Sequence, residues 1–388
     1  MRILVEAMHL LPCGTGCHCT HPEGSIFQPS APPSWNPAYL CCVTVLPDIR
    51  SLELPALKAW LEGIGELGFR ARQIHEWLWK RNAPGFEKMT NLGQGLRQRL
   101  QENFTLCKLK VHSEQRSNDG TIKYAFATAD GNLVEGVLIP TDSRVTACVS
   151  SQVGCSLTCK FCATGYLDMK RNLQHYEIYD QVAFIRDAAE REYGRPLTNI
   201  VYMGMGEPLL NYRQVLASID RITSEDGLGM APKRITLSTA GIAKMIKKLG
   251  DDNVRFEFAL SLHAANDRKR NEIMPINESN SLEALAEALA YFHAKTDTRV
   301  TYEYIIFRDF NDSLEDAEEL LQFSRIVPSK INIIEYNPID EAKFQNTSGN
   351  RLHRFRQYLE ERGAIVNVRR SRGKDVDGAC GQLALKHR

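Results

Sequence analysis

The sequence lacks the features of a membrane-inserted or secreted protein. No apolar run in its 388 residues reaches the roughly 18 that a membrane span needs. The N-terminus has an acidic Glu6 and no clean apolar stretch before a small-residue cleavage site, so we expect no signal peptide. The net charge is only +1, which excludes a globally basic chain, and no internal repeat is evident. These absences predict a cytoplasmic protein without a membrane partner.

Eleven cysteines are present, which in an intracellular chain indicates metal or redox chemistry rather than disulfides. Cys155, Cys159 and Cys162 stand in the run Cys-Ser-Leu-Thr-Cys-Lys-Phe-Cys. A 4Fe-4S cluster normally takes four thiolates, so three leave one iron open to an outside ligand. This spacing is the signature of radical S-adenosylmethionine (SAM) enzymes. The alternative is structural or zinc-binding cysteines, although zinc modules usually carry two Cys-x2-Cys arms.

The first hundred residues contain two different segments. Residues 1–50 show no sustained period, and we expect a disordered or atypical extension there; a soft-metal site at residues 13–19 is the alternative. Residues 51–107 are predicted to form a small helical domain, with two helical faces made by Leu54, Leu57, Leu61 and Ile64 and by Ile74, Trp77 and Leu78. Aromatic residues alternate with cations from Phe69 and from Trp77, a pattern that suits RNA contact but equally a buried aromatic beside a solvated basic face.

Strands and helices alternate from residue 144 to the C-terminus. The predicted strands are 145–149, 199–203, 234–238, 256–261, 300–306, 330–336 and 365–370, and residues 108–143 are predicted to form a short β extension around the turn Asn118-Asp-Gly. Repeated βα units imply a parallel sheet with helices outside. The predicted fold class is therefore α/β: an incomplete (β/α)6 radical-SAM barrel over residues 144–388, preceded by a small N-terminal helical accessory domain.

Several polar motifs follow the ends of the predicted strands, where α/β barrels carry their chemistry. Gly204-Met-Gly-Glu-Pro208 includes Gly206, which allows close backbone approach, and Glu207, whose carboxylate can receive an ammonium group. Taken alone, each motif is more often a turn or a satisfied loop polar group. Their shared position at strand ends makes them candidate SAM ligands. The same holds for Ser238, Ser261, Leu262, His263 and Asn337.

Two further cysteines lie outside the triplet. Cys148 comes seven residues before Cys155, and Cys380 lies in Asp377-Gly-Ala-Cys-Gly-Gln-Leu. A buried cysteine is usually inert packing. Because Cys380 has few large apolar neighbours in sequence, we expect an exposed, reactive loop thiol.

Together these motifs resemble the RlmN/Cfr family of radical-SAM methyltransferases that act on adenosine in RNA. The resemblance runs from about residue 52 to the C-terminus, with one departure at Glu335, where the family tends to have an apolar or prolyl residue. The matching stretches are Glu114-Gln-Arg-Ser-Asn-Asp-Gly-Thr-Ile-Lys, Leu133-Val-Glu-Gly-Val-Leu-Ile-Pro140, Cys148-Val-Ser-Ser-Gln-Val-Gly-Cys155, Gly204-Met-Gly-Glu-Pro-Leu-Leu-Asn211, Ile235-Thr-Leu-Ser-Thr-Ala-Gly241, Ser261-Leu-His-Ala264 and Ala379-Cys-Gly-Gln-Leu383.

The resemblance implies a role for each cysteine. Cys155, Cys159 and Cys162 would hold one 4Fe-4S cluster, and two SAM molecules would be used per turnover. Cys380 would take a methyl group from the first, and the second would give a radical that activates this methyl for addition to the adenine ring. Glu135 would remove the ring proton. Cys148 would then attack the sulfur of Cys380, forming a disulfide and releasing the methylated RNA.

The implied function is methylation of adenine C2 in 23S rRNA, at the peptidyl-transferase centre, and of the adenosine 3′ of the anticodon in some tRNAs. The implied partners are these RNAs and an unidentified electron donor, and we expect a monomer. The nearest alternative is C8 methylation by the antibiotic-resistance branch, which shares all of these cysteines. A non-catalytic iron–sulfur protein, for RNA binding or electron transfer, and a zinc-binding RNA module are also compatible with the cysteine triplet.

Overall fold

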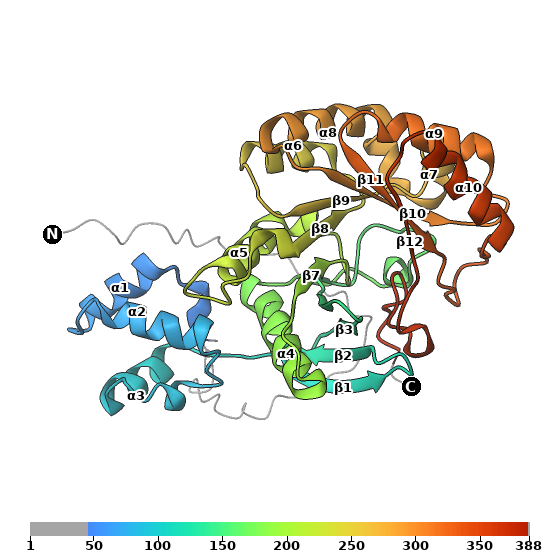
Figure 1. Ribbon diagram of the computed structural model, residues 1–388. Helices are drawn as coiled ribbons and strands as arrows, with labels where there is room; N and C mark the ends of the chain where they lie inside the picture. The colour runs from blue at the N-terminus through green and yellow to red at the C-terminus, as the bar shows by residue number, and fades with distance from the viewer. Residues whose placement is uncertain (1–45, 387–388) are drawn as a thin grey trace, which may run out of the picture. The chain divides into compact units, whose positions relative to one another are not determined.

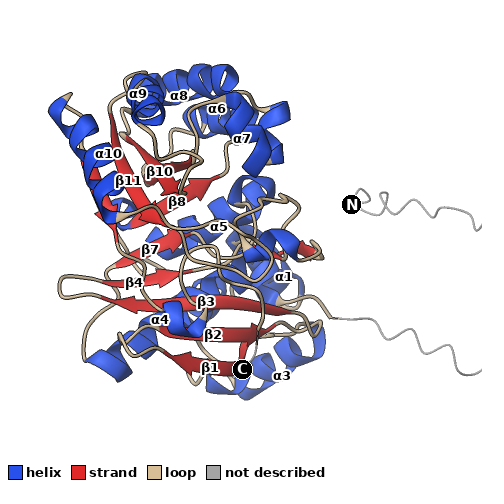
Figure 2. Cartoon of the chain, turned by 90° about the vertical axis from the view of Figure 1, so that its right-hand side faces the viewer, coloured by secondary structure: helices blue, strands red, loops and turns tan. Residues whose placement is uncertain are grey.

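A computed structural model of the chain describes residues 46–386. One ten-stranded sheet organises this part, in the order β1-β2-β3-β4-β7-β8-β9-β10-β11-β12 (Figure 2). Its strands are β1 Lys110–Arg116, β2 Ile122–Ala127, β3 Leu133–Pro140, β4 Val145–Cys148, β7 Asn199–Tyr202, β8 Ile235–Thr239, β9 Glu257–Ser261, β10 Val300–Ile306, β11 Ser329–Glu335 and β12 Val366–Arg369. A separate pair joins β5 Gln152–Val153 to β6 Arg171–Asn172.

The strands from β4 to β12 in this sheet all run parallel. Each lies within two residues of its predicted position, which confirms the α/β prediction. Parallel strands are covered on both faces and therefore read as nearly continuous apolar runs. β10 is the clearest case, because all seven of its residues are buried. Within residues 46–386 the sheet does not close, since β1 and β12 are its two edges, and this agrees with an incomplete barrel.

Helices between the parallel strands cover the outer side of the sheet, and Figure 1 shows α6, α8, α9 and α10 along β8 to β11. Ser313 starts α9 as a capping residue, with its hydroxyl accepting from the Asp316 amide at 3.1 Å. The helices are α4 His175–Tyr193, α5 Tyr212–Thr223, α6 Ala243–Asp251, α7 Asp267–Ile273, α8 Leu282–Thr296, α9 Leu314–Ser324 and α10 Gly349–Glu361. Over residues 46–386, no helix is both long and apolar enough to span a membrane.

The short strands predicted before the barrel belong to its sheet. β1, β2 and β3 form an antiparallel meander, and β3 pairs antiparallel with β4 so that Val137 faces Cys148. An antiparallel extension of a parallel sheet needs only short turns, here at 117–121 and 128–132. The meander therefore places Glu135 of β3 one strand away from the cysteine at the end of β4.

The accessory helices are α1 Leu54–Gly63, α2 Arg70–His75 and α3 Gln94–Asn103. Leu57, Leu61 and Ile74 are buried, as the periodicity predicts. Trp77 is half-buried and packs against this core, whereas Trp79, which the periodicity did not identify, is 1% exposed. The chain forms a π-helix over Glu76–Lys80. Because a π-helix has more residues per turn than an α-helix, the residues that face the core differ from those that α-helical spacing predicts.

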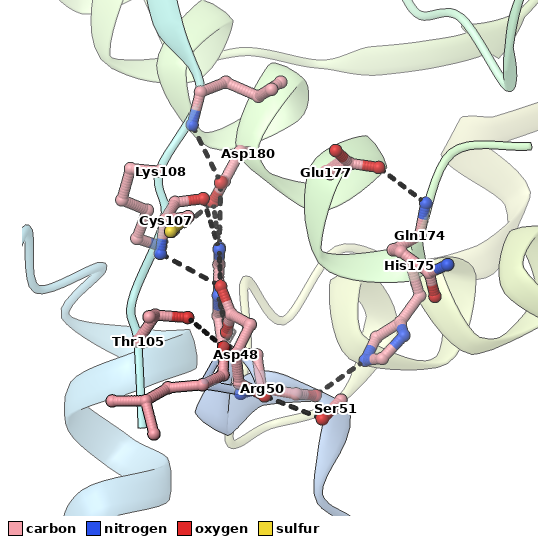
Figure 3. A network of polar contacts seen from close by, with 12 residues as sticks. Asp48, Arg50, Ser51, Thr105, Cys107, Lys108, Gln174, His175, Glu177 and Asp180 are labelled. Atoms are coloured by element: carbon pink, nitrogen blue, oxygen red, sulfur yellow. Dashed lines mark hydrogen bonds and ion pairs between the residues drawn. The ribbon is translucent and has the colours of Figure 1, made fainter. Parts of the chain in front are cut away.

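A buried polar network joins the accessory helices to α4 (Figure 3). Arg50 donates from Nη1 to both carboxylate oxygens of Asp180 at 2.8 Å, and from Nε and Nη2 to those of Asp48 at 2.9 and 2.8 Å. Nη2 also donates to the carbonyl of Cys107 at 2.8 Å, and Lys108 Nζ donates to Asp180 at 2.9 Å. The accessory domain thus includes Asp48 and Arg50 and begins before the predicted boundary at residue 51. The predictions for residues 1–45 lie outside the described residues.

Substituting Arg50 should test whether this network fixes the accessory helices. Arg50→Ala leaves the carboxylates of Asp48 and Asp180 buried without their main cation, and breaking a buried ion pair costs about 3–5 kcal/mol. We expect a loss of this size in the free energy of unfolding, measured by urea denaturation. The control is Arg186→Ala, which removes a surface pair with Asp187 on the same helix and should cost less than about 1 kcal/mol. Equal effects of the two changes would contradict this assignment.

Candidate active site

A cavity of about 150 Å³ lies at the carboxyl ends of the parallel strands. This position agrees with the expectation that barrel chemistry gathers where parallel strands end. Most of the side chains predicted from the sequence line it, although they come from segments far apart in the chain. These are Cys155, Cys159, Cys162, Gly206, Glu207, Ser238, Ser261, His263 and Cys380. The remaining candidates are not among its lining residues: Leu262, Asn337, Cys148 and Glu135.

The three cysteines of the triplet lie on an irregular loop whose backbone is closely packed. The Cys162 amide donates to the Cys159 carbonyl at 3.2 Å, and a Cβ on Gly165 would lie 2.8 Å from that carbonyl oxygen. Burial raises the pKa of all three thiols, that of Cys155 to about 12. Thiols that stay protonated in the free protein become thiolates when they bind a metal, so metal binding there would release protons.

The triplet fits a cluster better than a single metal ion. Across the part of the chain that is described, no three His, Cys, Asp or Glu side chains gather closely enough to hold one ion, as zinc requires. Thiolates of a 4Fe-4S cluster each bind a different iron and can stand farther apart. The three thiols nevertheless face one cavity, which is the arrangement that a cluster with an open iron needs.

Glu207 is buried at the edge of this cavity and is held by hydrogen bonds. Its Oε1 accepts from Thr239 Oγ1 at 2.7 Å and from the Leu209 amide at 2.9 Å, and its Oε2 accepts from the Ala240 amide at 2.7 Å. Burial raises the pKa of Glu207, and these hydrogen bonds oppose that shift. The carboxylate ties the loop after β7 to the end of β8 and, as an acceptor fixed at the cavity, suits an ammonium group.

His263 is neutral and presents a hydrogen-bond donor. Its Nδ1 accepts from the Ile305 amide at 3.1 Å, so the ring proton is on Nε2. Burial, together with the charge of Arg270, lowers the pKa of His263 to about 3. Nearby, Ser238 Oγ and Ser261 Oγ lie 3.2 Å apart and both line the cavity. These groups fit a ligand that carries hydroxyl and carboxylate oxygens.

Leu262 and Asn337 contribute differently from the cavity-lining residues. The Leu262 side chain is fully buried in the core, and its amide donates to the Glu303 carbonyl at 3.0 Å. Asn337 donates from Nδ2 to the Cys380 carbonyl at 3.0 Å, whereas its buried Oδ1 has no hydrogen-bond partner. An unsatisfied buried oxygen usually indicates a missing donor. Asn337 therefore holds the Cys380 loop and still has an acceptor free for a ligand.

Cys380 lines the cavity, whereas Cys148 does not. Cys380 is half-buried, so the expectation of an exposed loop thiol was wrong: the C-terminal segment folds back over the strand ends. Cys148 is buried at the end of β4. Burial raises the pKa of both thiols. All cysteines in residues 46–386 are free thiols, so the disulfide implied by the resemblance is absent from this part of the structure.

Arg369 and Glu303 were not identified from the sequence, although both line the cavity. Arg369 Nη1 donates to Glu303 Oε2 at 3.1 Å, and Asn332 Nδ2 donates to Glu303 Oε1 at 2.8 Å. The charge of Arg369 lowers the pKa of Cys380 and of Cys148, against the effect of burial. The sequence signal that could have identified this pair is Glu303, a carboxylate within the buried strand β10. A buried carboxylate needs a cationic partner.

Glu135 is completely buried and lies outside the cavity lining. Its Oε1 is 3.3 Å from Lys123 Nζ, and its Oε2 accepts from the Leu385 amide at 3.1 Å. The structure thus ties Glu135 to the segment that follows Cys380. In this arrangement, the segment around Leu385 covers the carboxylate.

Comparison with protein families agrees with this geometry. Residues 48–106 match the ribosomal RNA large subunit methyltransferase N-terminal domain, and residues 149–323 match the radical SAM superfamily. The second family implies a 4Fe-4S cluster and SAM, for which the cavity supplies three thiols and a set of polar ligands.

Individual relatives cover nearly the whole described chain. A probable dual-specificity RNA methyltransferase RlmN from Cytophaga hutchinsonii is 62% identical over 338 residues, which are 87% of this chain and 93% of the relative. The dual-specificity RNA methyltransferase RlmN of Anaeromyxobacter dehalogenans is 43% identical, covering 88% of this chain and 92% of its own. The crystal structure of a radical SAM methyltransferase from Sphaerobacter thermophilus superposes with a TM-score of 0.82 at 39% identity, covering 87% and 99% of the two chains.

These matches exclude the non-catalytic iron–sulfur protein and the zinc module, because the relatives are named as methyltransferases and the radical SAM match covers the cysteine triplet. Both the N-terminal helices and the barrel match, in the order found in this chain. The chain belongs to the RlmN family of dual-specificity radical SAM RNA methyltransferases.

Proposed function

We propose that this enzyme methylates C2 of an adenosine in 23S rRNA, at the peptidyl-transferase centre, and of the adenosine 3′ of the anticodon in tRNA. We further propose that the methyl group passes through Cys380. The observation that carries this proposal is that Cys380 opens onto the same cavity as Cys155, Cys159 and Cys162. A thiol in that position can meet both a methyl donor and a radical source without leaving a site that excludes water.

The chemistry explains why a thiol is needed. When bound in the cavity, the 4Fe-4S cluster and two SAM molecules per turnover supply one methyl group and one carbon radical. Carbon 2 of adenine is electron-poor and cannot attack a methyl donor, whereas the thiolate of Cys380 can. Cys380 therefore serves as the methyl carrier, and its sulfur holds the carbon while the bond to the base forms.

Two further residues complete the proposed reaction. Once the carbon–carbon bond has formed, the ring carries an unpaired electron, which a bound cluster could take back after supplying it for the cleavage of SAM. Glu135 takes the proton from C2, which requires the Leu385 amide to release the carboxylate first. The Cys148 thiolate then attacks the sulfur of Cys380. A disulfide forms, the bond between that sulfur and the methylene carbon breaks, and the carbon receives the electron pair and a proton to become the methyl group of the product.

The polar groups at the strand ends are proposed SAM ligands. Glu207, beside Gly206, accepts from the ammonium group of SAM. The hydroxyls of Ser238 and Ser261 and the Nε2 donor of His263 suit the ribose and carboxylate oxygens, with the buried oxygen of Asn337 as an acceptor. Leu262 contributes backbone alone, since its side chain is in the core.

The accessory helices are proposed to contact RNA. Phe69 is 52% exposed with the Arg70 guanidinium 4.9 Å from its ring centre, and the exposed Arg81 lies 4.6 Å from the Trp77 ring centre. Such pairs can stack on bases while their charge meets phosphates. Because the target carbon is inside a base stack, the adenosine must be extruded or lie in a loop.

We also propose that the enzyme is cytoplasmic, since both RNAs are found there. It would act as a monomer and receive electrons from an external donor.

The test is an anaerobic reaction with SAM, a chemical reductant and unmodified 23S rRNA or tRNA. Digested RNA is compared with synthetic 2-methyladenosine and 8-methyladenosine by chromatography and mass spectrometry. We expect 2-methyladenosine from both RNAs. Formation of 8-methyladenosine would overturn the assignment of the C2 position. If peptides that contain Cys380 carried no methyl group, the role of Cys380 as methyl carrier would be overturned.

Removing a cysteine of the triplet should abolish radical formation. Cys159→Ala leaves two thiolates, so the purified protein should lack brown iron–sulfur absorbance and produce no 5′-deoxyadenosine. The control is Cys107→Ala, which removes an exposed free thiol outside the cavity and should keep the absorbance. Normal cleavage of SAM by Cys159→Ala would contradict the cluster assignment.

The two remaining cysteines should fail at different steps. Cys148→Ala should accept the methyl group and add it to adenine, but should not release the product because no second thiolate can attack the sulfur of Cys380. We expect a covalent protein–RNA complex that survives denaturation, with the nucleotide on the Cys380 peptide by mass spectrometry. Cys380→Ala should form neither methyl-cysteine nor adduct. Free turnover of Cys148→Ala would show that the pairing is wrong.

Arg369 should control the pH dependence of methyl loading. Its charge lowers the pKa of Cys380, so Arg369→Gln raises that pKa and reduces the thiolate present near neutral pH. We expect methylation of Cys380 near neutral pH to slow and the rate profile to move to higher pH. The control is Arg370→Gln, a neighbouring exposed arginine. A profile unchanged by Arg369→Gln would rule out this role.

A further inference from the structure

One motif of the sequence touches the chemistry described above only through Lys123, which pairs with Glu135. The stretch from Glu114 to Lys123 forms the end of β1, a turn and the start of β2, and none of its residues lines the cavity. The turn is closed by its own backbone, since the Ser117 amide donates to the Thr121 carbonyl at 2.8 Å and Gly120 adopts a φ of +86°. A tight turn of this kind is sufficient to connect two strands. Its side chains, however, face another part of the protein.

The turn binds the segment that leads to Cys380, as Figure 1 shows at the red C-terminal chain beside β1 and β2. Asp375 accepts from Ser117 Oγ at 2.5 Å and from the Asn118 amide at 3.0 Å. In the opposite direction, Asp119 accepts from the Gly373 amide at 2.9 Å, and Arg372 donates to the Asp119 carbonyl. We call these reciprocal contacts the carboxylate clasp.

The fit between the two segments is close. Gly373 has a φ of +71°, and a Cβ there would lie 2.8 Å from Thr121 Cγ2. Beyond it the segment folds on itself, with the Gly378 amide donating to the Gly373 carbonyl at 2.8 Å. The hydrogen bonds from Ser117 and Asn118 lower the pKa of Asp375, so its side of the clasp stays charged near neutral pH.

A second set of contacts holds the chain just after Cys380. The Gly381 carbonyl accepts from the Ala163 amide at 2.7 Å, and the Leu383 carbonyl accepts from Thr164 Oγ1 at 2.6 Å. Cys380 thus lies between an anchor on the cysteine-triplet loop and the carboxylate clasp. The segment from Arg372 to Cys380 contains no helix or strand except one short 3-10 turn, so its position depends on such anchors.

We propose that Asp119 and Asp375 are positioning residues for Cys380: by fixing the chain before this cysteine to the β1–β2 turn, they hold its sulfur at the cavity. This inference rests on the proposed role of Cys380 as methyl carrier. Transfer of a methyl group needs the attacking sulfur in line with the carbon, and a misplacement of about 1 Å can cost roughly a hundredfold in rate. The carboxylate clasp fixes the position of the Cys380 sulfur through contacts that lie outside the cavity.

The experiment uses the full chain with its cluster and the variants Asp119→Ala and Asp375→Ala. Asp130→Ala is the matched control, because Asp130 sits in the other turn of the same meander and pairs with Arg171 instead. Ser117→Ala removes a single donor to Asp375 and should give a smaller effect of the same kind. The iron content and absorbance of each variant are measured first, as a check that the barrel is intact.

Two measurements follow. Limited trypsin digestion should cut the clasp variants after Arg372 or Lys374 at least tenfold faster than wild type, with Asp130→Ala unchanged. Methylation of Cys380 by SAM, without RNA, is a single-turnover reaction; its maximal rate constant should be at least tenfold lower, with an unchanged SAM concentration for half-maximal rate. A merely destabilised barrel would lose iron and raise that half-saturating concentration as well.

The outcomes are distinct. Unchanged tryptic cleavage, an unchanged rate constant for methylation of Cys380, or an equal loss in Asp130→Ala would overturn the clasp. Loss of iron or a raised half-saturating SAM concentration in the clasp variants would also overturn it, in favour of a structural role. If wild type itself takes no methyl at Cys380, the proposed function fails and the positioning role fails with it, a result that is visible before any variant is compared.

Discussion

Parallel hydrogen bonding from β4 to β12 is the constraint on which the rest of the structure depends. In a parallel sheet all strands end on the same side, and loops after the strands must meet there. The cysteine triplet follows β4, Glu207 follows β7, and Ser238 and Ser261 lie near the ends of β8 and β9. Their convergence on one cavity is therefore a consequence of strand direction, and no residue in that set needs to be close to another in sequence.

The cavity is lined by groups that are costly to bury, and the structure compensates for each in a different way. Glu207 is satisfied by three protein hydrogen bonds, and Glu303 by Arg369 and Asn332. The thiols are compensated less, so burial raises their pKa values until a metal or an alkyl group replaces the proton. The charge of Arg369 acts on both Cys148 and Cys380, which links their reactivity through a single guanidinium.

Contacts to carboxylates hold two further segments in place. Arg50 joins the accessory helices to α4, and the carboxylate clasp joins the C-terminal segment to the β1–β2 turn. The Arg50 pairs are buried and tolerate few geometries, because any displacement leaves an unpaired charge. The carboxylate clasp instead uses exposed carboxylates. Fixed positions of this kind would suit the proposed RNA contact by the accessory helices and the proposed methyl transfer through Cys380.

The sequence by itself determined the strands of the barrel, the cysteine triplet and the candidate ligands at strand ends, because apolar runs and motif spacing are local properties. The hypothesis that Cys148 and Cys380 take part in the reaction came only from family resemblance. Tertiary structure alone decided that Cys380 lines a cavity, that the segment around Leu385 covers Glu135, and that Asp119 holds the chain before Cys380. The last two contacts join residues 250 and 254 positions apart. No local pattern of residue types encodes which side chains folding will bring together over such separations.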